Sequence, residues 1–261
     1  MKTPLFNVDI LSIYEKHGER VLLPKRMAMA TPDTCSAING IVKDIENVGG
    51  KLVLSDLFRS YDMQYQAHLD WITKKKKAFS PPPGGSMHEA GRAFDLSLED
   101  ISVTLSDFWD IAKKWNVLPI ISTPDIKKSE AWHFDCRGSH SIVYDYYKSG
   151  KASNMLPYAA MAVSAILAIG VKVDRFNSHQ AEAYLQSCLI RLGFQLGNID
   201  GLIGNKTKKA LEDAEISTAD INVAVLTAED KLQAKFPEET HEIVEVDNSS
   251  FDFKLPRYIE N

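Results

Sequence analysis

The sequence predicts an α+β protein in two parts: a small antiparallel sheet flanked by helices, followed by a small all-helical bundle. Two observations support this fold class. Up to about residue 150, helical spacing of apolar residues and short strand-like runs alternate without a regular βαβ rhythm. Beyond this point every periodic segment has helical spacing. The length of 261 residues fits one to two domains, and we place the first over residues 1–150.

Three helices are predicted in the first part, over residues 35–48, 61–73 and 105–115. The first has apolar residues three and four positions apart, and the glycine pair 49–50 that follows it is typical of a helix end. Ser106 is the expected N-cap of the third helix. These helices are expected to flank the sheet.

Four strands are predicted, over residues 52–58, 93–98, 118–122 and 131–135. Within residues 93–98, small or polar side chains alternate with Phe and Leu, which is typical of a strand with two different faces. The segment 80–85 is rich in proline and glycine and must be a loop. We expect the strands to form a small antiparallel sheet.

The second part is predicted to be a separate helical domain over residues 155–235. A stretch rich in lysine and serine, residues 148–154, is typical of a linker. Glycines punctuate the turn between the last two periodic segments. The helices are expected over residues 156–169, 180–192 and 207–214.

The acidic charge is concentrated at the C-terminus. The formal net charge is −5, and residues 236–261, an expected acidic tail, carry seven acidic side chains against two basic ones. The rest of the chain is neutral overall, which argues against broad electrostatic binding to nucleic acid. Three cysteines are too few for a disulfide scaffold, and their odd number indicates free thiols.

No export or membrane-spanning segment is evident. Residues 1–20 mix charged side chains into apolar ones and lack the apolar core of a signal peptide. The most apolar stretch, residues 156–171, is shorter than the ~20 residues needed to cross a bilayer. We therefore expect a buried helix here and no membrane insertion.

Two short segments carry residues with metal-binding chemistry. The first contains His88 and Asp95, with Gly91 between them to let the backbone turn, and the second contains Glu130 and His133. Two imidazoles and one carboxylate form the ligand set of a catalytic zinc site, which keeps a fourth position for water. Glu130 is close enough in sequence to take the proton of that water, whose pKa the metal lowers to about 7.

These segments resemble the zinc D-Ala-D-Ala carboxypeptidase family, peptidoglycan peptidases that include the vancomycin-resistance dipeptidases. The family pattern is Ser-x-His-x-x-Gly-x-Ala-x-Asp, then Glu-x-x-His, and its defining positions are filled here by Ser86, His88, Gly91, Ala93, Asp95, Glu130 and His133. The resemblance covers about residues 35–145. It implies that His88, Asp95 and His133 bind zinc and that Glu130 is the catalytic base.

Residues 57–61, together with Gln64, resemble the upstream Arg-Ser segment of the same family. The resemblance implies that Arg59 polarises the scissile carbonyl and stabilises the developing oxyanion. Trp132, directly before the second histidine, is more similar to the carboxypeptidase branch of the family than to its phage endopeptidase branch.

The second part resembles the helical peptidoglycan-binding domain. A Leu-Gly-aromatic turn occupies residues 192–194, and the pattern Asp-Gly-x-x-Gly-x-x-Thr occupies residues 200–207 before the last expected helix. The aromatic-Gln ending usual in that family is replaced by residues 212–215, Glu-Asp-Ala-Glu. The resemblance implies that this part binds the glycan of the cell wall.

Together these features predict a zinc-dependent peptidase that cuts the peptidoglycan stem peptide as a D-Ala-D-Ala carboxypeptidase and is anchored to the wall by its second domain. One alternative is a phage-type endolysin that cuts between L-Ala and D-Glu. Another is a non-enzymatic wall-binding or virion structural protein, against which the intact Glu130 argues. We expect a monomer acting at the bacterial cell wall, in the periplasm or outside the cell. The missing signal peptide fits a phage-encoded protein released by another protein.

Overall fold

The structure, a computed structural model, describes residues 2–155 and 157–240. Most of the expected acidic tail, from residue 241 on, lies outside the described residues. The described chain contains a six-stranded and a two-stranded sheet. The strands of the larger sheet are, in spatial order, β3 (Glu19–Leu22), β2 (Leu11–Lys16), β5 (Leu54–Asp56), β6 (Ala93–Leu96), β8 (His133–Cys136) and β7 (Val117–Pro119).

The larger sheet is mixed, which corrects the prediction of a purely antiparallel sheet. β2 and β5 run parallel, whereas every other neighbouring pair is antiparallel. The chain between β2 and β5 passes through helix α1 (Pro32–Glu46), the kind of long connection that a parallel pair requires. The class α+β is retained, because helices and strands still follow one another without a βαβ rhythm.

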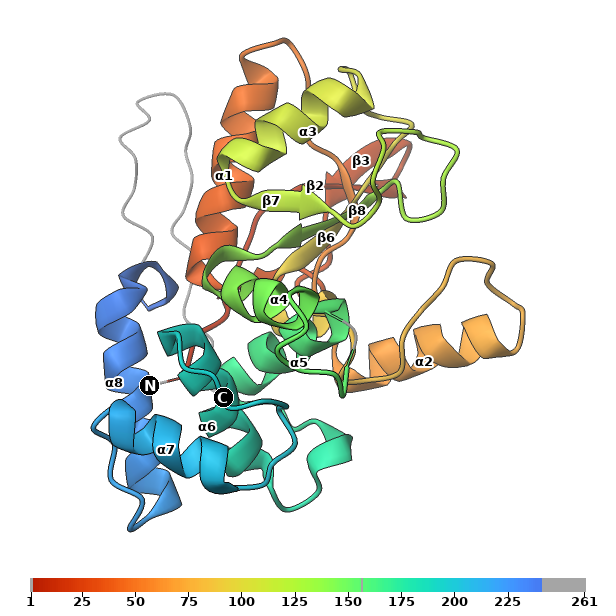
Figure 1. Ribbon diagram of the computed structural model, residues 1–261. Coiled ribbons are helices and arrows are strands. Elements are labelled where there is room, and N and C mark those ends of the chain that lie inside the picture. Colours follow the sequence, from red (N-terminus) through yellow and green to blue (C-terminus); the bar gives the residue numbers. More distant parts are fainter. Residues whose placement is uncertain (1, 156, 241–261) are drawn as a thin grey trace.

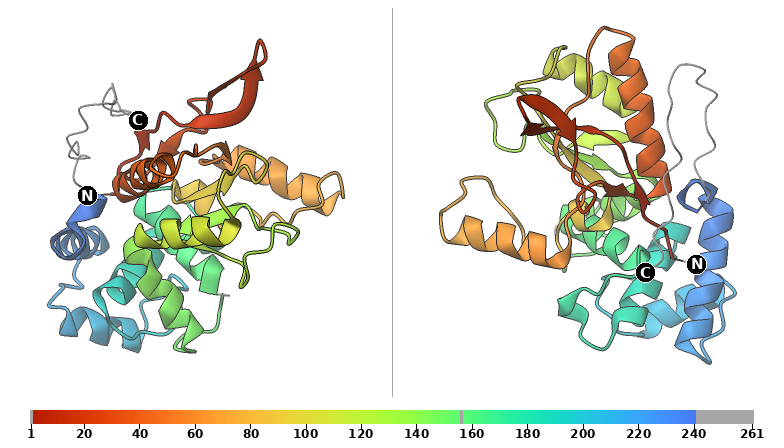
Figure 2. Two further views of the ribbon diagram at one scale, coloured as in Figure 1. Left: turned by 90° about the horizontal axis from the view of Figure 1, so that it is seen from above. Right: turned by 180° about the vertical axis from the view of Figure 1, so that it is seen from behind.

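The N-terminal strands are not predicted by the sequence pattern. β1 (Phe6–Asn7) pairs with β4 (Met29–Ala30), and the β2–β3 hairpin projects from one edge of the larger sheet (Figure 2). The outer half of this hairpin is exposed on both faces. It therefore lacks the apolar alternation that identifies a half-buried strand.

The helices of the first part lie close to the predicted ranges. They are α1, α2 (Tyr61–Ile72) and α3 (Leu105–Lys114). The N-cap of α3 is Thr104 rather than the expected Ser106, since the Thr104 hydroxyl accepts the backbone N–H of Asp107. Helix α2 extends away from the body of the molecule, and the chain after it returns to the sheet (Figure 1).

Within the described residues, five further α-helices follow the sheet. In chain order they are α4 (Ser141–Lys148), α5 (Pro157–Ala168), α6 (Gln180–Leu192), α7 (Asn205–Asp213) and α8 (Ile221–Lys235). Helices α4 and α8 are additional to the predicted ones. The elements α4 and α5 lie between the sheet and the group formed by α6, α7 and α8 (Figure 1).

The turn between α6 and α7 is held by one buried side chain. Gln186 of α6 accepts the backbone N–H groups of Asp200 and Gly201, and its amide nitrogen donates to the Asp200 carboxylate. Gly201 has a φ of +78°, and a Cβ there would lie 2.9 Å from that of His179. The Asp-Gly pair of the sequence pattern is thus needed for the turn itself.

Two hydrophobic cores lie on opposite faces of the sheet. One is formed by α1, α3 and strand residues such as Phe94 of β6. The other is formed by α4 to α8 and includes Ala93, the preceding residue of the same strand, together with Met87 and Ala90. Nine consecutive residues of α5, 160–168, are buried in this second core. The segment that carries the candidate metal ligands therefore packs directly against the helical part.

Within residues 2–155 and 157–240, none of the helices combines the length and the apolar character needed to span a membrane.

Candidate metal centre

His88 and Asp95 are positioned by a short 3-10 turn and the strand that follows it. Residues 87–90 form the turn, Gly91 ends it at a φ of +61°, and Asp95 lies in β6. A Cβ on Gly91 would lie 2.7 Å from Leu5 Cδ2. Only glycine fits this reversal without strain, as the sequence predicts.

The start of the turn is fixed by a reciprocal cap. The Ser86 hydroxyl accepts the backbone N–H of His88, while the Glu89 carboxylate accepts that of Ser86. Glu89 also accepts the N–H of Gly84 at 2.9 Å. Burial raises the pKa of Glu89 to about 7. This carboxyl group connects the proline-glycine loop to the turn that holds His88.

His133 reaches the same place through strand pairing. It lies in β8, directly opposite Asp95 in the antiparallel β6–β8 pair. Side chains of such opposed residues start about 5 Å apart and point to the same face. The two ligands contributed by distant segments are therefore brought together by the register of the sheet.

The three predicted ligands converge on one point. His88 Nε2 lies 3.2 Å from His133 Nδ1, and Asp95 Oδ1 lies 3.2 Å and 3.0 Å from these two nitrogens. Two donors bound to one tetrahedral zinc ion at about 2.0–2.1 Å are roughly 3.3 Å apart. The spacing of the donors thus fits a single zinc-sized ion. Within the described residues, His88, Asp95 and His133 form a group of side chains that could hold a metal ion.

The outer nitrogen of each imidazole has its own partner. His88 Nδ1 lies 2.8 Å from the carbonyl oxygen of Leu57, to which it can only donate. His133 Nε2 lies 2.9 Å from Asp135 Oδ1. With a proton on each outer nitrogen, the lone pairs of both inner nitrogens face the Asp95 carboxylate oxygen. Three lone pairs so close together need a cation between them, so the residues present fit a metal.

The electrostatics of the site also favour a bound cation. Burial alone would raise the pKa of Asp95, but His88 and His133 hold it well below its usual range. Burial lowers the pKa of His133, and the opposing effect of Asp135 and Asp95 raises it to about 10. The carboxylates thus hold positive charge at the position where a metal would take the place of a proton.

Arg59 lies beside the ligands and is held by three acceptors. Its Nε donates to Asp56 at 2.6 Å, one Nη to Gln64 at 3.2 Å and the other to Asp95 Oδ2 at 3.2 Å. Burial alone would lower the pKa of Arg59, but the Asp56 and Asp95 carboxylates raise it. A guanidinium has five N–H donors, so two remain for a ligand in the cleft.

Glu130 lies at the cleft without contributing to the ligand cluster. Its φ of +67° is uncommon for a residue with a side chain. Burial raises its pKa, whereas the positive charges of His133 and Lys76 lower it. A half-buried carboxyl group beside a metal site, but outside its ligand set, has the placement expected of a general base.

The ligands lie in a cleft of about 430 Å³, within the range of small-molecule and peptide sites. One wall comes from the segment before β8, with Glu130 and Trp132, and another from the segment after α2, with Lys76. A third wall comes from α5, with Tyr158 and Ala162. The contribution of α5 is not predicted by the sequence, which assigns this helix to wall binding.

Asp135 is the functional residue that sequence reasoning misses most clearly. It follows His133 by two positions in a strand, so both side chains point to the same face. That spacing is the signal that could have identified it. Two ligand-type side chains that follow His133 in the sequence lie outside the ligand cluster. Cys136 is buried, and burial raises its pKa to about 12. His140 is buried against Ser164 of α5.

No protein-family model and no curated protein matches the chain. Among solved structures, it is similar to the LdcB LD-carboxypeptidase, described for its peptidoglycan recognition, with 19% identity and a TM-score of 0.40 over 51% of this chain and 67% of that chain. It is also similar to the L,D-carboxypeptidase DacB of Streptococcus pneumoniae, with 20% identity and a TM-score of 0.32 over 46% of this chain and 78% of that one. A structure of DacB from Streptococcus pneumoniae D39 has 18% identity and a TM-score of 0.34, over 52% of this chain and 85% of that one. These values are too low to assign an activity.

Proposed function

We propose that the protein is a zinc-dependent peptidase that hydrolyses a peptide bond in the peptidoglycan stem peptide, as a D-Ala-D-Ala carboxypeptidase. The observation that carries the proposal is the convergence of three ligand atoms, from His88, Asp95 and His133, with the outer nitrogen of each imidazole already paired. Such a site binds a cation through two imidazoles and a carboxylate, the donor set of hydrolytic zinc centres.

When bound, zinc would supply Lewis-acid activation of a water molecule and of the scissile carbonyl. Glu130 takes one proton from the water as the water oxygen bonds to the carbonyl carbon. It then gives that proton to the amide nitrogen as the C–N bond breaks. The two remaining donors of Arg59 stabilise the negative charge that develops on the carbonyl oxygen. Water is the only co-reactant: its oxygen ends on the new carboxyl group and its proton on the leaving amine.

The helical residues 155–235 are proposed to hold the enzyme on the insoluble wall. This rests on their resemblance to the peptidoglycan-binding domain and on the intact Asp-Gly turn held by Gln186. Binding raises the local concentration of the catalytic site near its substrate. We propose that the enzyme acts at the bacterial cell wall as a monomer.

Digestion of purified peptidoglycan tests the proposal. The zinc-loaded protein is expected to release free D-Ala from the stem peptide, with mass spectrometry identifying the product and its new carboxyl end. Addition of a chelator should stop the release, and added zinc should restore it. A zinc-loaded, folded protein that leaves peptidoglycan and free stem peptides unchanged would contradict the proposal.

The same digest distinguishes the alternatives. New amino ends on D-Glu indicate an endopeptidase that cuts between L-Ala and D-Glu. Binding to the wall without new amino or carboxyl ends indicates a non-enzymatic wall-binding protein. The position of Glu130 at the cleft, beside the ligands and outside their cluster, favours an enzyme over this last alternative.

A further inference from the structure

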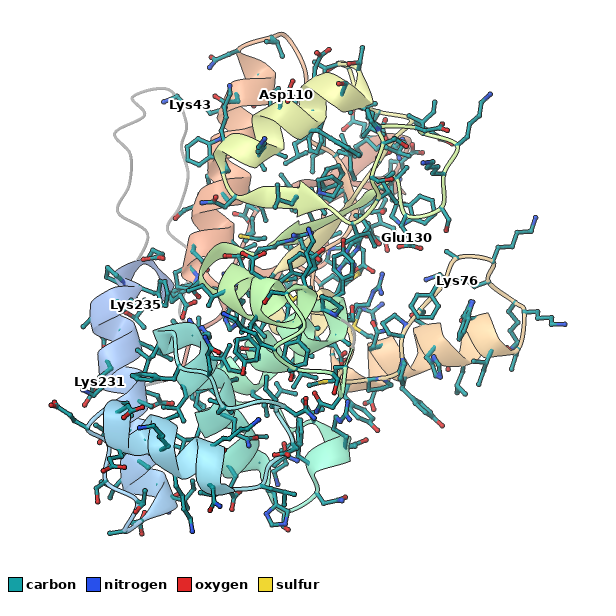
Figure 3. All side chains as sticks on the ribbon, viewed as in Figure 1. Lys43, Lys76, Asp110, Glu130, Lys231 and Lys235 are labelled. Atoms are coloured by element: carbon teal, nitrogen blue, oxygen red, sulfur yellow. The ribbon has the colours of Figure 1, made fainter. Side chains whose placement is uncertain are left out.

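The cleft contains a lysine that the proposed chemistry does not use. Lys76 lies in the segment between α2 and the turn that holds His88, and its side chain lines the same cleft as the metal ligands and Glu130. Figure 3 labels Lys76 and Glu130 on the same side of the molecule, where their two segments approach each other.

Two contacts with α2 hold the segment that contains Lys76. Its N–H donates to the carbonyl of Asp70 at 3.0 Å. Three residues later, the ring of Phe79 packs edge-on against Trp71 with centroids 4.8 Å apart. Lys76 is half-buried, whereas its neighbours Lys75 and Lys77 are exposed. Residues 74–77 are a run of four lysines, and Lys76 is the member that lines the cleft.

The ammonium group of Lys76 has no hydrogen bond or ion pair with the described part of the chain. Arg59, which also lines the cleft, is paired with Asp56 and Asp95. The carboxylates of Asp95 and Asp135 face the histidines of the site. Lys76 thus offers the cleft a positive charge that the described residues do not neutralise at hydrogen-bond distance.

The position of Lys76 relative to Glu130 indicates which part of a substrate it meets. Lys76 and Glu130 line the same cleft, and the charge of Lys76 is among those that act on the Glu130 carboxyl group. In the proposed reaction Glu130 gives its proton to the leaving nitrogen. The residue that leaves must therefore lie against Glu130, within reach of the flexible four-carbon stem of Lys76.

We propose that Lys76 binds the C-terminal carboxylate of the leaving residue and so makes the enzyme an exopeptidase. This inference rests on the proposed function and deepens it. A charge-assisted bond to a free carboxylate favours a substrate whose leaving group is the last residue. A chain that continues beyond the scissile bond offers a neutral amide in the same place. The acidic residue within the stem peptide could also supply a carboxylate, and the test separates the two.

The test uses the zinc-loaded protein and three stem peptides. The first has a free C-terminus and the second a C-terminal amide. The third has a free C-terminus, and its internal acidic residue is amidated. The wild-type protein is compared with Lys76→Met, Lys76→Arg and the exposed control Lys77→Met. We expect the wild type and Lys77→Met to cleave both peptides with a free C-terminus in preference to the C-terminal amide. Lys76→Met should raise KM for them about 10- to 100-fold at similar kcat, and so remove the preference. Lys76→Arg should retain it.

Binding of the same peptides by calorimetry provides a second readout. Lys76→Met should bind the peptides with a free C-terminus more weakly, and the C-terminal amide as well as the wild type does. Retained preference in folded Lys76→Met overturns the inference. A preference that follows the internal carboxylate instead also overturns it. If the wild type binds the peptides but cleaves none, the proposed function fails, while the calorimetric comparison still decides the role of Lys76.

Discussion

His133 presents its Nδ1 atom to the candidate metal centre because Asp135 accepts the hydrogen on Nε2. The imidazole is thereby fixed in both tautomer and ring orientation. His88 is held through the other ring nitrogen: Nδ1 donates to the Leu57 carbonyl, and Nε2 faces the site. At the scale of single residues, the site is thus defined as much by what holds the ligands as by the ligands themselves.

Replacing Asp135 by alanine is expected to weaken zinc binding about 10- to 100-fold, because outer partners of metal-bound histidines typically contribute this much. Competition with a chromophoric chelator measures the affinity. Asp145→Ala, at an exposed aspartate of α4, is the matched control and should bind zinc like the wild type. Unchanged affinity in Asp135→Ala would show that the carboxylate does not support the metal.

Glu130→Gln is expected to retain zinc and lose activity by about 10²- to 10⁴-fold, since a carboxamide cannot take a proton from water. Metal analysis and turnover of a stem peptide are measured on the same preparation. The exposed Glu99→Gln variant serves as control. Turnover near that of the wild type would refute Glu130 as the base, and loss of zinc would make it a ligand.

At the scale of elements, the turn between His88 and Asp95 depends on Gly91. A Cβ there would lie 2.7 Å from Leu5 Cδ2 and 3.1 Å from the Ala30 Cα, at a φ of +61°. Gly91→Ala is therefore expected to lower the free energy of unfolding by about 2–4 kcal/mol, from backbone strain and overpacking together. Denaturant titration measures this change.

Gly18→Ala is the matched control for Gly91→Ala. Gly18 also has a positive φ, of +83°, but a Cβ there would meet no atom within 4 Å. Gly18→Ala should lower the free energy of unfolding only by the cost of backbone strain, about 1–2 kcal/mol. Equal losses in the two variants would mean that the close approach at Gly91 is relieved without cost.

The sequence predicts elements well where burial gives a regular pattern. Helix α6 spans the predicted residues 180–192, and its apolar face is buried. Helix α8 is missed because its buried face is made largely of alanines, such as Ala224 and Ala228, which give little apolar contrast. The candidate ligands, which the structure brings together, could be predicted because they occur in short motifs. Lys76 could not, because the lysine run has no period that distinguishes its members.

At the scale of the whole molecule, the helical part and the candidate metal site share one core. Met87 and Ala90, which flank His88 in the 3-10 turn, are buried in the same core as α5 and α6. Arg191 of α6 also donates to Ser139, before α4, and pairs with Glu239. Sequence patterns locate such helices but contain no signal for which distant surfaces they cover. The α5 wall of the cleft follows from packing alone.

A chain ending at Gly150 is accordingly expected to lose its folded state, because removal of α5 exposes the buried face of the turn at Met87 and Ala90. Circular dichroism and zinc binding, compared with the full chain, measure the loss. A truncated chain that stays folded, binds zinc and cleaves a small stem peptide would show instead that the helical part serves wall binding alone.

A zinc titration of the metal-free, full-length protein, with release of D-Ala from a soluble stem peptide followed, tests the proposed zinc peptidase activity most directly. Activity is expected to rise from the background level and to saturate at one zinc per chain. His88→Ala should not reach this activity at the same zinc concentration. Full activity in the metal-free protein, or a folded protein that stays inactive with one zinc bound, would contradict the proposed function.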